Sequence, residues 1–175
     1  IQLEDVYKPV SPSDIYVCLK DLGIVSTFST LLANFLSLFK ASPYGLEAIK
    51  LGHLDDYNLN RWKIFERLFH WIYKQYQSVL EANKAIDFSD MINKATVYTE
   101  KTGFHEKTKG SFKIKYLLVD EFQDISPIRA SFIKALRQAN PGCSLMGVGD
   151  DWQAIYRFTG SDVRLTTEFE QHFGA

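Results

Sequence analysis

The sequence predicts an α/β protein with a mainly helical N-terminal half and a parallel sheet in its C-terminal half. Apolar residues in the first half recur at three- and four-residue intervals, which is the period of an amphipathic helix. Two short apolar runs in the second half, Tyr116–Val119 and Ser144–Val148, have the composition of strands buried on both faces. A helical segment separates them, and the order strand, helix, strand implies a right-handed crossover in a parallel sheet.

Composition limits the kind of protein. A chain of 175 residues with 46% apolar and 14% aromatic residues is globular and of one-domain length. A net charge of −1 excludes a strongly basic nucleic-acid binder, so any contact with nucleic acid must use a local surface. Cys18 and Cys143 suggest no disulfide framework, which indicates a cytoplasmic location. No apolar run is long enough to cross a bilayer, so no membrane partner is expected.

Helices are predicted throughout the first half of the chain. Ser13 or Ser11 can begin the first and Ser26 or Thr27 the second, and glycine or proline ends them. The predicted ranges are 11–23, 26–43, 46–51 and 58–83. One face of the last helix carries Trp62, Phe65, Phe69, Ile72, Tyr76 and Val79. Packing in the core is the expected role of this face, and stacking on DNA is the alternative.

Three further segments connect this region to the sheet. Asp87 can cap a helix whose first turn contains Asp90. Residues 100–115 form a polar connector, in which the lysines are expected to be solvated and phosphate contact is the alternative. Ser126 and Pro127 can begin the helix between the strands, which Asn-Pro-Gly would end after residue 139.

Two acidic residues follow the first predicted strand directly. The segment Leu118–Asp124 places the adjacent carboxylates Asp120 and Glu121 after an apolar run. In an open parallel sheet, ligands bind at the carboxyl ends of the strands. Carboxylates there can hold a hydrated Mg²⁺ and orient a water molecule for attack on a phosphate. A solvated acidic turn is the alternative for this segment taken alone.

The segment after the second predicted strand, Gly147–Phe158, arrives at the same edge of the sheet. Gln153 offers a neutral amide that can donate a hydrogen bond to a phosphate oxygen. Tyr156 and Phe158 offer faces on which a base can stack, an interaction worth about 1–3 kcal/mol per base. The two segments together therefore indicate a site for phosphate chemistry and for nucleic acid.

Three segments resemble one protein family. Val119–Asp124 resembles motif II of UvrD/Rep-type superfamily 1 DNA helicases, and Val148–Gly160 resembles motif III. Asp87–Ile92 resembles the short Asp-Phe-Asp-Asp-Leu box that precedes motif II. Trp152 and the Phe-Thr-Gly sequence at the end of motif III are similar to the helicase IV branch of this family. The resemblance covers Ile86–Gly174, about half of the chain.

The resemblance implies a division of the chain. Residues 86–175 would belong to motor subdomain 1A and form part of a RecA-like P-loop NTPase sheet. Residues 1–85 would hold the inserted helical subdomain 1B and flanking helices. ATP and Mg²⁺ would be the cofactors of the full-length parent. Its partner would be single-stranded or partly duplex DNA, along which it would move from 3′ to 5′.

The resemblance also implies roles for single residues. Asp120 would bind Mg²⁺, Glu121 would activate the hydrolytic water, and Gln153 would sense the γ-phosphate and link it to DNA. Tyr156 and Phe158 would touch single-stranded DNA.

Gln123 and Asp124 would help to couple the nucleotide site to the DNA site. Many relatives have Trp-Arg-Gly where this chain has Phe158-Thr159-Gly160. The contact made by that arginine therefore cannot be assigned to Thr159.

The phosphate-binding loop of this family has no counterpart in the sequence. Such a loop needs Gly-Lys followed by Ser or Thr, and no glycine here is followed by lysine. We therefore expect a fragment of a longer helicase that is inactive alone. In such a fragment the motif III strand would have a bare edge and an under-covered apolar face, through which the chain could pair with a second copy.

Two other classes of function remain open from the residues. A metal-dependent nuclease could gather carboxylates around two metal ions. The carboxylates concerned are Asp120, Glu121, Asp124, Asp150 and Asp151. A non-enzymatic interaction module could keep the fold without the chemistry.

Overall fold

The structure is a computed structural model that describes residues 11–43, 55–101, 108 and 113–174. The chain divides into two compact units, Ile1–Phe35 and Leu36–Ala175. The predicted helix at 46–51 lies outside the described residues, as does most of the polar connector at 100–115. Whether residues 1–85 form a subdomain of the 1B type stays a prediction.

In the part of the chain that the structure describes, four helices precede the sheet, and their ends lie close to the predicted ones. They are α1 (Pro12–Asp21), α2 (Val25–Lys40), α3 (Asp56–Ala82) and α4 (Phe88–Glu100). The Ser11 hydroxyl accepts a hydrogen bond of 3.1 Å from the Asp14 N–H, which begins α1. The Asp87 carboxylate accepts one of 2.8 Å from the Asp90 N–H, which begins α4. The Asp87 cap was predicted, and Ser11 was one of two serines predicted to begin α1, because capping depends on residues only three positions apart.

The aromatic face of α3 packs as predicted in its middle turns. Phe69 is buried, and its ring lies edge-on to that of Phe39 from α2, with 5.3 Å between the ring centroids. Trp62, Phe65, Ile72 and Tyr76 are half-buried on the same face. The prediction was wrong for Val79, which is 59% exposed. Helix α2 ends at Lys40, whose ammonium lies over the Tyr76 ring, and so it does not cover the last turn of α3.

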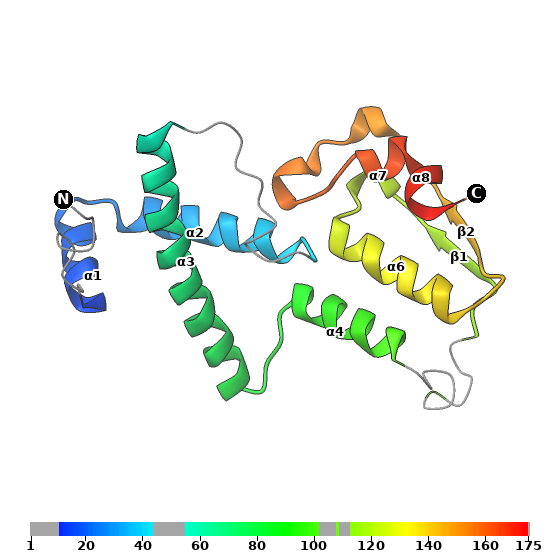
Figure 1. Ribbon diagram of the computed structural model, residues 1–175, viewed down its shortest axis with the longest axis horizontal. Helices are drawn as coiled ribbons and strands as arrows, with labels where there is room; N and C mark the ends of the chain where they lie inside the picture. The colour runs from blue at the N-terminus through cyan, green and yellow to red at the C-terminus, as the bar shows by residue number, and fades with distance from the viewer. Residues whose placement is uncertain (1–10, 44–54, 102–107, 109–112, 175) are drawn as a thin grey trace. The chain divides into compact units, whose positions relative to one another are not determined.

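The predicted parallel strand pair is confirmed. Strand β1 (Tyr116–Val119) pairs in parallel with β2 (Ser144–Gly147), and helix α6 (Pro127–Ala139) connects them (Figure 1). The register places Val119 opposite Gly147, so both strands end at the same edge of the sheet. The Val148 N–H donates a hydrogen bond of 2.8 Å to the Val119 carbonyl and extends the pairing past that edge.

Burial of both faces of the strands was predicted, and this was wrong. Leu117, Val119 and Leu145 pack against the core, whereas Leu118 and Met146 on the other face are 71% and 58% exposed. The reason is that the surrounding elements supply apolar residues to one face only. These elements are α6, α7 (Arg164–Thr167) and α8 (Phe169–Phe173), and the last two were not predicted. The predicted under-covered apolar face of the motif III strand is thus observed.

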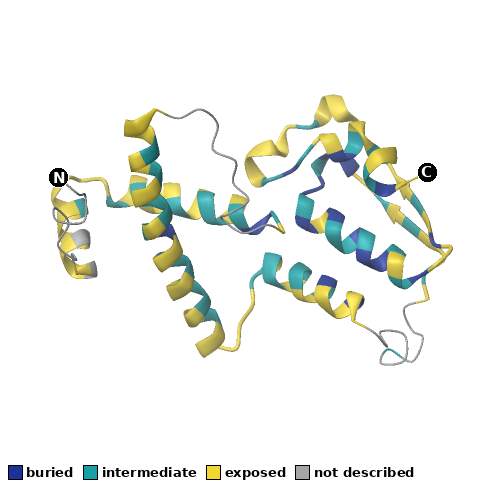
Figure 2. Cartoon of the chain, viewed as in Figure 1, coloured by how far each residue is buried: buried dark blue, intermediate teal, exposed yellow. Residues whose placement is uncertain are grey.

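The core of the second unit lies between the sheet and these helices. Its buried residues are Phe122, Ile125, Ala130, Ile133, Leu165 and Phe173. Figure 2 shows the buried residues concentrated along α6, which also packs against α4. Asn140, just after α6, is buried, and its side-chain oxygen accepts a hydrogen bond of 2.9 Å from the Ile114 N–H. This bond ties the end of α6 to the segment of chain that enters β1.

Candidate functional site

Glu121, predicted as a catalytic residue, and Asp120, predicted as the magnesium ligand, lie on a sharp turn at the end of β1. Glu121 adopts a left-handed backbone conformation with φ 49° and ψ 46°. That conformation costs a residue with a Cβ atom about 1–2 kcal/mol. The Glu121 N–H donates a hydrogen bond of 2.9 Å to the Asp120 carboxylate, and both side chains are exposed. The turn therefore presents the two carboxylates beside each other at the edge of the sheet, as predicted.

Phe122 anchors this turn in the core. It begins the short 3₁₀ helix η3 (Phe122–Asp124) and is 1% exposed. Its ring lies edge-on to the rings of Phe169 and Phe173 in α8, at centroid distances of 5.2 and 5.5 Å. Its N–H donates a hydrogen bond of 2.9 Å to the Val148 carbonyl at the end of β2. The acidic turn is thus held by the core and by the neighbouring strand.

The side chain of Gln123 links the ends of the two strands. This side chain is almost fully buried, and its amide nitrogen donates a hydrogen bond of 2.7 Å to the Glu121 carboxylate. Its amide oxygen accepts one of 3.0 Å from the Asp150 N–H. The Asp150 carboxylate in turn accepts one of 2.8 Å from the side-chain amide of Gln153. Hydrogen bonds therefore run from Glu121 through Gln123 and Asp150 to Gln153.

Two glycines allow the strand ends to approach this closely. A Cβ atom on Gly149 would overlap the Gln123 side-chain oxygen and lie 2.9 Å from the Phe122 backbone nitrogen. A Cβ atom on Gly147 would lie 2.7 Å from the Phe122 ring. Sequence analysis assigned neither glycine a role. The signal available was a pair of glycines in and just after a strand, which often marks a close approach of backbones.

The predicted DNA-binding aromatics form an exposed pair. They belong to η5 (Tyr156–Thr159), which follows η4 (Asp151–Gln153) along the chain after β2. The centroids of the Tyr156 and Phe158 rings are 6.0 Å apart, and Phe158 is 72% exposed. Trp152 is also exposed. These aromatic side chains do not pack in the core, so their rings are available for stacking on bases.

Asp124, predicted as the second coupling residue, does not take part in the hydrogen-bonded link. Its backbone N–H donates to the Glu121 carbonyl at 2.9 Å. One of its side-chain oxygens is buried and has no hydrogen-bond partner among the described residues. A buried carboxylate oxygen without a donor is costly, so this atom is available to a donor supplied from elsewhere.

The carboxylates fit a magnesium ion held with a phosphate better than a two-metal nuclease site. Mg²⁺ usually takes one or two carboxylates together with substrate phosphate oxygens. Asp120 is exposed and accepts one hydrogen bond, from Glu121, so it can serve in that way. Within the described residues, no three His, Cys, Asp or Glu side chains gather as metal ligands. The Asp150 carboxylate instead accepts hydrogen bonds from Trp152 and Gln153.

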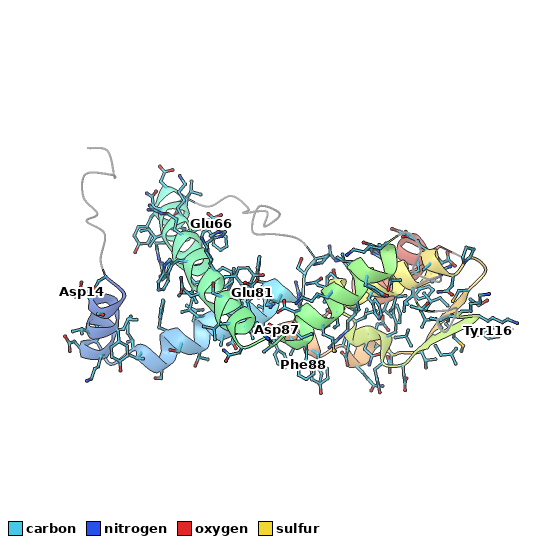
Figure 3. The ribbon with its side chains drawn as sticks, turned by 90° about the horizontal axis from the view of Figure 1, so that it is seen from below. Asp14, Glu66, Glu81, Asp87, Phe88 and Tyr116 are labelled. Atoms are coloured by element: carbon cyan, nitrogen blue, oxygen red, sulfur yellow. The ribbon has the colours of Figure 1, made fainter. Side chains whose placement is uncertain are left out.

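A partly buried ionic cluster, which sequence analysis missed, joins the end of α2 to α3 and to the start of α4. The Lys40 ammonium lies 2.5 Å from the Asp87 carboxylate and 2.7 Å from that of Asp90. The Tyr76 hydroxyl donates a hydrogen bond of 2.8 Å to Asp87, which Figure 3 shows between α3 and α4. Burial favours a higher pKa of Asp87, but the hydrogen bonds from Lys40, Asp90 and Tyr76 outweigh it and lower this pKa. Burial likewise opposes the charge of Lys40, yet both carboxylates raise its pKa.

This cluster is the contact through which the box at Asp87–Ile92 meets the end of α2. The neighbouring Ala41 carbonyl accepts a hydrogen bond of 3.1 Å from the Ile128 N–H in α6. The residue pair Lys40 and Ala41 therefore connects α4 to the helix that follows the acidic turn.

Comparison with known proteins agrees with this geometry. The family described as UvrD/REP helicase N-terminal domain matches residues 24–174. This chain belongs to that family. The match includes the acidic turn, the segment after β2 and most of the helical region, so it extends beyond the segments that carry the resemblance in the sequence.

Three relatives illustrate the similarity. DNA helicase IV of Escherichia coli K12 is 48% identical over 101 residues, which are 58% of this chain. The ATP-dependent DNA helicase Rep of Buchnera aphidicola from Acyrthosiphon pisum is 37% identical over 55% of this chain. The ATP-dependent DNA helicase PcrA of Staphylococcus epidermidis is 33% identical over 58%. The matches span 14%, 15% and 14% of these relatives' own lengths.

No helix in the described residues is both long enough and apolar enough to span a membrane. Both cysteines are free thiols, with Cys18 exposed and Cys143 buried.

Proposed function

We propose that this chain is the part of an ATP-dependent DNA helicase that couples nucleotide hydrolysis to movement along single-stranded DNA. The observation that carries the proposal is the hydrogen-bonded link from Glu121 through Gln123 and Asp150 to Gln153. It joins the acidic turn after β1 to the segment that continues into the exposed aromatic pair. Family membership supports the same reading, because the relatives are named as DNA helicases.

The nucleotide end of the link would use three side chains. Asp120 would hold Mg²⁺, which offsets the negative charge of the phosphates when bound. Glu121 would accept a proton from the attacking water, with its carboxylate oriented by the amide of Gln123. Gln153 would contact the γ-phosphate, and in our proposal its amide then exchanges the Asp150 carboxylate for a phosphate oxygen. That exchange of partners would report the presence of the γ-phosphate to Asp150 and Gln123.

The DNA end would use the aromatic pair in η5. Tyr156 and Phe158 would stack on bases of a single strand or of the single-stranded part of a partial duplex. Only two residues separate Gln153 from Tyr156. A movement of Gln153 on binding the γ-phosphate would therefore reach the aromatic pair through a short stretch of backbone. The proposed direction of movement is 3′ to 5′, and the substrate implies a cytoplasmic location.

The parallel pair β1 and β2 would be part of a larger RecA-like sheet. A complete motor also needs a Gly-Lys-Ser or Gly-Lys-Thr loop, and no glycine in this chain is followed by lysine. The active enzyme proposed here is therefore a longer protein that contains this chain. We expect the chain alone to hydrolyse no ATP.

The uncovered face of β2 leads to a second proposal, that the isolated chain pairs with another copy of itself. Strand β2 pairs only with β1 among the described residues, and its exposed face carries Met146 and Val148. An unpaired strand edge beside exposed apolar side chains favours strand addition.

Strand separation by the longer protein tests the helicase proposal. A duplex with a 3′ single-stranded tail should be unwound when ATP and Mg²⁺ are present and should stay paired without ATP. A duplex with a 5′ tail is the matched control and should not be unwound. A longer protein that contains no phosphate-binding loop and separates neither duplex would contradict the proposal and favour an interaction module.

A further inference from the structure

We propose that Arg157 binds a backbone phosphate of single-stranded nucleic acid, in a hollow beside the aromatic pair Tyr156 and Phe158. This inference rests on the proposed DNA contact of that pair and adds the residue that would hold the charged backbone. The resemblance to known helicases assigns no role to Arg157. Its neighbour Thr159 stands where many relatives have an arginine.

The hollow has a volume of about 550 Å³ and lies entirely within the second unit. Its lining includes Pro127 at the start of α6, Arg157 and Gly160 in and after η5, Asp162 just before α7 and Arg164 at its start. The lining thus contains two arginines and one carboxylate. This is a concave surface with an excess of positive charge on a protein whose net charge is −1.

Only one of the two arginines is free to bind an anion. The Arg164 guanidinium is paired with the Asp162 carboxylate through two hydrogen bonds, of 2.7 and 2.9 Å. These hydrogen bonds from Arg164 also hold the pKa of Asp162 below its ordinary value, so the carboxylate stays ionised. The Arg157 guanidinium is exposed and makes no hydrogen bond or ion pair with any residue that the structure describes. Arg157 therefore supplies the uncompensated charge of the hollow.

The backbone around Arg157 is held in place, so its side chain starts from a defined position. The Gly160 N–H donates a hydrogen bond of 3.1 Å to the Arg157 carbonyl, and Gly160 has φ 94°. The Thr159 hydroxyl donates one of 2.7 Å to the Tyr156 carbonyl. On the far side of the hollow, the Asp162 N–H donates one of 3.0 Å to the Ile125 carbonyl. Hydrogen bonds therefore hold the backbone on both sides of the hollow.

The neighbours of Arg157 decide which phosphate it would take. A free phosphate or a nucleotide would use the guanidinium but would not need two exposed rings on either side of it in sequence. A single strand needs both, because each base to be stacked is joined to a phosphate within a few ångströms. A planar guanidinium donates two parallel hydrogen bonds to phosphate oxygens, which suits this position better than a lysine would.

Fluorescence anisotropy of a labelled oligothymidylate with this chain tests the assignment. Arg157→Gln should weaken binding about 3- to 10-fold and should reduce the slope of log K against log salt by about 0.7, the value for one single-strand phosphate contact. The loss should be equal for oligothymidylate and oligodeoxyadenylate, because the phosphate is common to both. Arg157→Lys should keep most of the salt slope, because it keeps the charge.

Two further variants make the result specific. Arg67→Gln on α3 removes the same charge from another exposed arginine and should change affinity less than Arg157→Gln. Phe158→Ala should weaken binding while leaving the salt slope unchanged, because it removes stacking and no charge. The proposal is overturned if Phe158→Ala weakens binding but Arg157→Gln changes neither affinity nor slope. It is also overturned if ATP displaces the oligonucleotide from the unmodified chain but not from Arg157→Gln, which would assign the arginine to a nucleotide.

Failure of the wider proposal gives a different pattern. If the unmodified chain binds no oligonucleotide at low salt, both the proposed DNA contact of the aromatic pair and the proposed phosphate contact of Arg157 are contradicted. Strand separation by the longer protein is measured independently of this binding assay.

Discussion

The side-chain oxygen of Gln123 accepts a hydrogen bond of 3.0 Å from the backbone N–H of Asp150. This single contact joins the segment after β1 to the segment after β2, and it is made by a side chain that is 2% exposed. Because the amide nitrogen of the same side chain donates to Glu121, a displacement of either strand end must move the other. Gln123 is thus a positioning residue for the acidic turn.

Replacing Gln123 by leucine should remove both hydrogen bonds and leave the Asp150 N–H without its partner. We expect a loss in the free energy of unfolding of about 1–3 kcal/mol, measured by urea denaturation of this chain. Gln138→Leu is the matched control, since Gln138 is exposed on α6, and it should change stability by less than about 0.5 kcal/mol. Equal effects of the two substitutions would show that the Gln123 contacts contribute nothing.

Replacing Gly149 by alanine should force the two strand ends apart. The new Cβ atom would lie 2.9 Å from the Phe122 backbone nitrogen, which is buried in the turn and cannot move cheaply. A loss of stability of about 2–3 kcal/mol is expected, in the range for overpacked sites. Gly142→Ala is the control, because Gly142 has φ 85° but open space around it. Its cost should be the conformational one alone, about 1–2 kcal/mol. A Gly149→Ala chain as stable as the unmodified one would contradict the close approach.

The ionic cluster at Lys40 should make stability depend on acid pH. The pKa of Asp87 is lowered in the folded chain, so the stability contributed by its carboxylate is complete above the unfolded pKa. That contribution is lost as the pH falls from about 4 through the lower folded pKa. Asp87→Asn should therefore flatten the decline of the melting temperature below about pH 4.

Exposed carboxylates elsewhere provide the comparison for this pH effect. Glu81→Gln removes an exposed carboxylate near the end of α3, labelled in Figure 3, and should leave the acid decline unchanged. Lys40→Met should cost about 3 kcal/mol at neutral pH, because two partly buried carboxylates lose their counter-ion. An acid decline in Asp87→Asn as steep as in the unmodified chain would contradict the assigned pKa shift.

The uncovered face of β2 should produce association that depends on concentration. Sedimentation equilibrium of this chain should detect dimers, and Met146→Lys should reduce them, because a charge on that face opposes apolar contact. Leu22→Lys replaces an exposed leucine after α1 and serves as the control, with dimers retained. A chain that stays monomeric up to high concentration would refute the pairing.

The parts of the fold that were predicted from the sequence are those set by nearby residues. The caps at Ser11 and Asp87 depend on partners three positions along the chain; Asp87 was identified, and Ser11 was one of the two serines considered for the first helix. The bounds of β1 were predicted because Tyr116–Val119 is a short apolar run between polar segments. The acidic turn was placed at the sheet edge because parallel strands deliver their carboxyl ends to the same side.

The parts that were missed depend on distant residues. Lys40 and Asp87 are 47 positions apart, and a lysine at the end of an amphipathic helix gives no indication of a buried partner. The need for glycine at position 149 arises only when Phe122 and Gln123 lie against it. Leu118 and Met146 were predicted to be buried because they are apolar. The sequence alone does not show whether another element covers that face of the strands, and in the structure both residues are exposed.

Turnover by the longer protein with Glu121→Gln tests the central claim most directly. Glutamine keeps the size of the side chain and its capacity to accept a hydrogen bond from Gln123, but it cannot take a proton from water. We predict that DNA-stimulated ATP hydrolysis falls at least about 100-fold, while binding of Mg²⁺ and ATP stays within about threefold. Strong hydrolysis stimulated by single-stranded DNA in Glu121→Gln would contradict the assignment of the acidic turn as the catalytic site.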